Sequence, residues 1–150
     1  MKEMAKFIPL ISSGVAGPLG VLHLPRLWQK ISLEALGKLA DGYPGIGPGF
    51  DSMVINGLGL TPNAVREYIS SNKPGYPQFE AWVASQPGVK LDRASVQKLN
   101  LAIQGYIHDD ETRKQILSES GLPDDGSIAP DAVSLNNLED WNLFYQSELK

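Results

Sequence analysis

Proline and glycine interrupt this chain so often that only short regular elements fit between them. The 150 residues include 11 prolines and 15 glycines. Proline lacks a backbone N–H and fits an α-helix best at its first position, whereas glycine commonly ends one. Between these residues, apolar side chains recur every three or four positions, and the alternation typical of β-strands is nearly absent. The pattern predicts an all-α fold of six or seven short helices joined by long loops rich in glycine and proline.

Proline or a capping side chain marks several expected helix starts. Pro25 and Pro62 each suit a first helical position, and Asp92 suits the N-cap of a later helix. The last expected helix, from about Ser134, carries an apolar stripe that we expect to dock on the core. This stripe consists of Leu135, Leu138, Trp141 and Tyr145. Its burial predicts that Trp141→Ala costs about 3–5 kcal/mol of stability.

The length of the chain suits one domain. We expect an N-terminal leader over residues 1–17 and a single helical domain over residues 18–150. Because cysteine is absent, thiol catalysis, disulfides and zinc sites built on cysteine are excluded. The two histidines, His23 and His108, lie far apart and lack the spacing of metal ligands, so we expect no metal. No cofactor motif is present, and we expect no cofactor.

Charge and hydropathy restrict the partners. A net charge of −4 without a long basic run disfavours nucleic acid. No apolar stretch approaches the roughly 18 residues that span a bilayer, so we expect no membrane partner and a cytoplasmic location. The sequence indicates no oligomeric state.

The stretch "GVLHLPRLWQK", residues 20–30, places two cations at an expected helix start. Arg26 lies in the first turn and Lys30 one turn further on, where the helix dipole disfavours positive charge. A bound anion would compensate, because helix N-termini accept phosphate and carboxylate groups. We therefore predict a site for a small anionic ligand, with Arg26, Lys30 and Asp51 as substrate-binding residues. His23 would be the general acid or base and Tyr43 a hydrogen-bond donor, which makes these two the catalytic candidates.

Two alternatives stay open for these residues. Arg26 would instead pair with a carboxylate of the same chain, such as Asp51 or Glu34, while His23 caps a backbone group. The glycine-rich loop over residues 44–49 is either a lid over the site or a plain linker, because its glycines lack the context of a phosphate-binding loop.

The predicted function is that of a small-molecule-binding helical protein. As an enzyme it would carry out cofactor-independent proton transfer, of the isomerase, lyase or cyclase type, but the sequence does not decide whether it is an enzyme. The alternative is a non-catalytic protein–protein interaction or structural module. A concave pocket at His23 and Arg26 would favour the first function. Bonding of both within the fold, together with an exposed apolar patch, would favour the second.

Several blocks of the sequence also fit one pattern. They are "LGVLHLPRLWQK", "LGKLADGY", "FDSMVINGLGLTPNAVREYI", "ETRKQILSESGLPDDG" and "VSLNNLEDW". Together they resemble an uncharacterised bacterial family, the domain of unknown function 5069, from Pro18 to Trp141. The resemblance implies a small helical domain and brings no activity. The family often has a polar segment with a cysteine after the residue matching Tyr43, where this chain reads "PGIGPGF".

Overall fold

The computed structural model describes residues 5–150, and it confirms the all-α prediction. Seven α-helices form within these residues, and β-pairing there is limited to isolated bridges. A short π-helical turn, η1, extends the last helix. The helices are α1 (Leu24–Ala35), α2 (Phe50–Leu58), α3 (Pro62–Asn72), α4 (Tyr76–Ser85), α5 (Arg93–Gly105), α6 (Asp110–Glu119) and α7 (Ala132–Phe144), followed by η1 (Tyr145–Leu149).

Side-chain caps fix four of the helix starts. Thr61, Asp92, Asp109 and Asp131 each accept a hydrogen bond from the backbone N–H three residues later. Such a cap satisfies one of the N–H groups that the first turn leaves unpaired. The predicted starts at Pro62 and after Asp92 are therefore confirmed. Helix α1 begins at Leu24, so Pro25 is its second residue and not its first.

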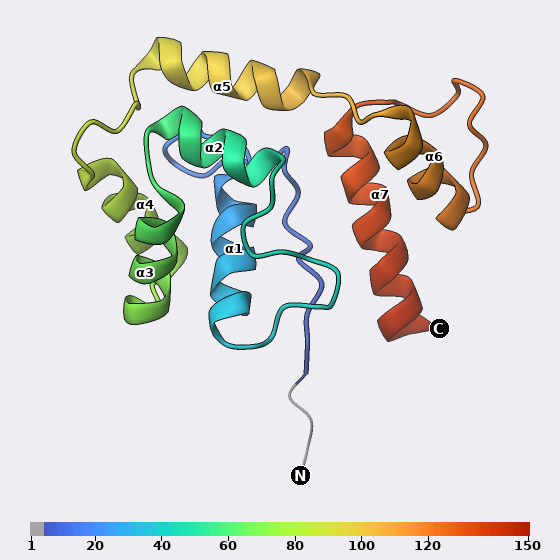
Figure 1. Cartoon of the computed structure of the whole chain (residues 1–150), viewed down its shortest axis with the longest axis horizontal. Helices are drawn as coiled ribbons and strands as arrows, with labels where there is room; N and C mark the ends of the chain where they lie inside the picture. The colour runs from blue at the N-terminus through green and yellow to red at the C-terminus, as the bar shows by residue number, and fades with distance from the viewer. Residues whose placement is uncertain (1–4) are drawn as a thin grey trace.

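The helices surround α1 (Figure 1). Helices α3 and α4 pack against α1 on one side, and α2 crosses above it with α5 alongside. Helix α7 contacts both α5 and α6, so it links the two ends of the domain. The N-terminal segment runs between α1 and α7 (Figure 1). Within residues 5–150, no helix combines the length and apolar character that a membrane crossing requires.

Two apolar clusters hold this arrangement together. The main core joins α1 to α5 and includes the fully buried Leu27, Val54 and Phe79. A smaller cluster joins α6 to α7 through Ile116 and Leu135. Helix α7 takes part in both clusters, because its first residue, Ala132, is buried in the main core. Polar groups further along α7 add a second connection to the main part of the domain.

The segment that we set apart as a leader, residues 1–17, is described from residue 5 onward and hydrogen-bonds to the helical domain. The backbone of Phe7 exchanges hydrogen bonds with Lys38 and Ala40, and the carbonyl of Val15 accepts from the N–H of His23. Residues 5–17 thus contribute backbone pairing to the fold.

The predicted stripe on the last helix is wrong at its C-terminal half. Leu135 is buried at 1% exposure, but Trp141 is 60% exposed and Tyr145 49% exposed. The buried neighbour of Trp141 is Asp140, at 2% exposure. Successive helical residues point about 100° apart, so turning Asp140 inward turns Trp141 outward. A polar contact of Asp140, described below, thus overrides the apolar pattern.

Because Trp141 is exposed, its truncation should cost little stability. We expect Trp141→Ala to change the free energy of unfolding by less than about 0.5 kcal/mol, as for most surface positions. Leu135→Ala removes a fully buried side chain and should cost about 2–5 kcal/mol. Urea denaturation of both variants measures the difference. Equal losses in the two variants would contradict the exposure of Trp141.

Candidate functional site

His23 lies at the N-cap of α1 in the left-handed region, with φ of 71°. A non-glycine residue adopts this backbone conformation only when its surroundings hold it there. Two hydrogen bonds fix its ring: Nδ1 lies 2.8 Å from Oγ of Ser13, and Nε2 lies 2.6 Å from Oδ1 of Asp51. Burial lowers the pKa of His23 and outweighs the opposing effect of Asp51, so the ring is neutral. Since a carboxylate only accepts, Nε2 carries the proton and Nδ1 accepts from Ser13.

The carboxylate of Asp51, in the first turn of α2, accepts hydrogen bonds from three donors. Besides His23, Nζ of Lys30 lies 2.5 Å from its Oδ2, and the N–H of Gly47 donates to the same oxygen at 2.7 Å. Burial alone would raise the pKa of Asp51, but the His23 hydrogen bond and the Lys30 charge outweigh burial and lower it. Asp51 is therefore an ionised, buried carboxylate that ties α2 to α1.

Arg26 forms a second buried group with Asp140 and Tyr43. Its guanidinium donates to both carboxylate oxygens of Asp140, at 2.7 and 3.2 Å, and to the carbonyls of Pro9 and Ile11, each at 3.0 Å. The hydroxyl of Tyr43 donates to Oδ1 of Asp140 at 2.8 Å. Burial and the Asp140 charge raise the pKa of Tyr43, so its hydroxyl stays protonated. This group connects α1, the N-terminal segment, the loop after α1 and α7.

The glycine-rich loop belongs to the same structure. Gly45 and Gly47 are buried, and their N–H groups donate to the carboxylates of Glu34 and Asp51. A Cβ at Gly45 would lie 2.2 Å from Glu34 Oε2, so only glycine fits there without displacing that side chain. These bonds anchor the loop to the fold at both glycines.

All five residues that the sequence singled out lie in these two hydrogen-bonded groups, which together we call the polar core; Tyr43 is half-buried and the other four are buried. It comprises Ser13, His23, Arg26, Lys30, Tyr43, Asp51 and Asp140. The geometry agrees with the alternative in which Arg26 pairs with a carboxylate of the same chain. Its partner, however, is neither Asp51 nor Glu34. Arg26 pairs with Asp140, Asp51 takes His23 and Lys30, and Glu34 pairs with Arg66. The side chain of His23 caps no backbone group.

Ser13, His23 and Asp51 follow the hydrogen-bond order of a hydrolytic triad, with the two ring nitrogens exchanged. A nucleophile must reach its substrate, yet Ser13 is 2% exposed and Asp51 3% exposed. Every polar atom described above already has a partner inside the protein. The geometry is that of a closed structural network.

Sequence reasoning missed Ser13 and Asp140. Ser13 lies in the segment assigned to the leader, and Asp140 adjoins a tryptophan that was expected inside. Asp140 lies beside the predicted apolar stripe of α7, so the stripe gives no signal for its burial. Its partner, Arg26, is 114 positions away in the chain, so spacing alone could not connect them.

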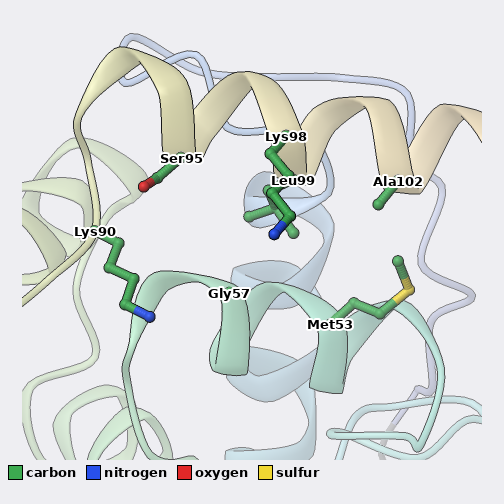
Figure 2. A pocket seen from close by; sticks show the side chains of 7 residues that line it. All are labelled: Met53, Gly57, Lys90, Ser95, Lys98, Leu99 and Ala102. Carbon is green, nitrogen blue, oxygen red and sulfur yellow. The ribbon is translucent and has the colours of Figure 1, made fainter.

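A cavity of about 340 Å³ lies elsewhere, between α2 and α5 (Figure 2). Two lysines line it, Lys90 before α5 and Lys98 on α5, and neither amine forms a hydrogen bond or ion pair with the described residues. Figure 2 shows the Lys98 amine directed into the space between the helices. The other lining residues are Met53, Gly57, Ser95, Leu99 and Ala102.

Local contacts shape this cavity. The backbone N–H of Lys90 donates to the carbonyl of Leu58 at 2.9 Å, which fixes the lysine beside the end of α2. Gly57 lets the helices approach, because a Cβ there would lie 2.9 Å from Cδ1 of Leu99. The backbone N–H of Ser95 donates to the carboxylate of Asp92, the α5 cap, at 3.1 Å, and the interaction with Ser95 lowers the pKa of Asp92.

Cations dominate this part of an otherwise acidic chain. Residues 90–98 carry three cations and one carboxylate, while the whole chain has a net charge of −4. The sequence shows this cluster of cations, but it does not show that the cluster lies beside a cavity.

His108 forms a hydrogen bond with Asn136 at 2.8 Å. Within residues 5–150, no group of three acidic or histidine side chains is arranged to hold a metal.

Comparison with models of known protein families and with curated proteins finds no match for this chain. The resemblance to the uncharacterised family therefore stays a prediction.

Proposed function

We propose that this protein binds a small anionic molecule in the cavity between α2 and α5. The observation that carries the proposal is the pair of lysine amines, Lys90 and Lys98, beside a cavity and without a hydrogen-bonding partner among the described residues. An anion bound beside either amine would gain a charge-assisted hydrogen bond, and the second amine adds positive charge to the same cavity. The volume of about 340 Å³ lies at the lower end of the range for small-molecule sites.

The cavity suits an anion better than the polar core does. Arg26 and Lys30 are each 6% exposed and already paired with carboxylates, so a ligand there would have to displace Asp140 or Asp51. Proton transfer by His23 and Tyr43 stays a prediction that requires the polar core to open. In this proposal the polar core instead holds α2 in place, and α2 forms one wall of the cavity.

Anion binding at the cavity is tested by thermal stability. Phosphate and short carboxylates should raise the melting temperature relative to chloride at matched ionic strength, because a ligand of the folded state stabilises it. The increase should be lost in the Lys90→Gln, Lys98→Gln double variant. Lys114→Gln on α6, an exposed lysine away from the cavity, is the matched control and should keep the increase. Equal anion effects in all three proteins would contradict the proposal.

A separate observation favours the alternative function, a protein–protein interaction module. Trp141, Tyr145 and Leu149 follow one another along α7 and η1 at 60%, 49% and 64% exposure. Exposed apolar side chains in a row are typical of a surface that meets another molecule. If anions leave the melting temperature unchanged, this face becomes the better candidate.

A further inference from the structure

The two ends of the cavity between α2 and α5 differ in chemistry. Lys90 and Ser95 line the end nearest the start of α5, and Figure 2 shows the Lys98 amine next to Leu99, midway along the cavity. At the other end, Figure 2 shows Met53 directed from α2 toward Ala102 on α5, and Leu99 lies between the two ends. A ligand that fills the whole cavity therefore needs an anionic head and an apolar body.

We propose that the ligand is a linear acyl or alkyl chain of short to medium length that ends in a carboxylate. This inference rests on the proposed anion site and adds the class of molecule. The carboxylate lies beside the lysine amines, and the chain passes Leu99 to reach Met53 and Ala102.

Two features of the apolar end support a flexible chain over a rigid ring system. Methionine is unbranched and adapts its shape to an irregular neighbour. Leu99 packs directly on Gly57, so the ligand chain has to run past the side of Leu99, and the small side chain of Ala102 takes up little of the space beyond it. A volume of about 340 Å³ suits a single short to medium chain.

The test is a series of straight-chain carboxylates measured by calorimetry on the full chain: acetate, butyrate, hexanoate and octanoate. Each buried methylene should tighten binding about fourfold, the equivalent of about 0.8 kcal/mol, until the chain exceeds the cavity. Hexanol and hexylammonium carry the same chain without the negative charge and should bind much more weakly than hexanoate.

Ala102→Leu separates the two parts of the proposal. Ala102 is exposed, so the larger side chain fills the apolar end without straining the core. This variant should keep the response to phosphate and acetate but lose the gain from hexanoate to octanoate. Ala94→Leu, also exposed on α5 but outside the cavity, should behave as the wild type.

The outcomes distinguish this inference from the proposed function. Binding of phosphate and of all carboxylates with equal affinity would overturn the ligand class and leave the anion site standing. Chain-length dependence that persists unchanged in Ala102→Leu would also overturn it. No response to any anion would overturn both.

Discussion

Arg26→Ala should destabilise the protein by about 3–5 kcal/mol, because it leaves a buried charge without its partner. Asp140 is 2% exposed and would retain only the hydroxyl of Tyr43 as a donor. The carbonyls of Pro9 and Ile11 would lose their donor as well. Chemical denaturation measures the free energy of unfolding. Arg66→Ala is the surface control: Arg66 pairs with Glu34 at 44% side-chain exposure, and exposed pairs contribute about 0.2–1 kcal/mol.

A double variant sharpens this result. If Arg26 and Asp140 stabilise the fold mainly through each other, Arg26→Ala with Asp140→Ala should cost less than the sum of the single variants. A loss in Arg26→Ala no larger than in Arg66→Ala would contradict the paired arrangement. It would instead support the sequence-based expectation that Arg26 awaits an external anion.

Asp51→Ala should have an effect of similar size, about 3–5 kcal/mol. The substitution leaves the ammonium of Lys30 buried at 6% exposure without a carboxylate, and it removes the acceptor of His23 and Gly47. It also releases the start of α2 from α1. Asp41→Ala is the control, because Asp41 is an exposed acid paired with Lys6 and should matter little.

Acid titration gives a second readout for Asp51. Its pKa is lowered in the folded protein, whereas the unfolded side chain titrates near pH 3.9. The stability that its ionised form provides is therefore fully present above that pH and is lost as the pH falls through the folded pKa. The wild type should lose this contribution below about pH 4, and Asp51→Ala should lack it at every pH. A difference between the two proteins that persists unchanged into strong acid would contradict an ionised Asp51.

The sequence predicted the helices well because their signals are local. Pro62 follows a capping threonine, and Asp92 caps the helix after it, so each start depends on residues within one turn. His23, Arg26 and Lys30 are predicted as one site for the same reason, because they lie close together at one helix end. Asp51 and Tyr43 are expected at the same site, and both lie in the polar core.

Contacts between residues that are far apart in the sequence could not be predicted from local patterns. The inward turn of Asp140 and the outward turn of Trp141 depend on Arg26, which belongs to a distant helix. The cavity likewise depends on the approach of α2 to α5 at Gly57, a contact that no spacing in the sequence reveals. Burial of the polar core also depends on residues 9–13, which the sequence placed in a leader.

The most direct test of where this protein binds an anion is a titration of isotope-labelled protein with hexanoate, followed by amide chemical shifts. We expect shift changes centred on Met53, Gly57, Lys98 and Ala102 around the cavity, with the signals of His23 and Arg26 unchanged. Changes centred on His23, Arg26 and the loop over residues 44–49, with none between α2 and α5, would contradict it and place the ligand in the polar core.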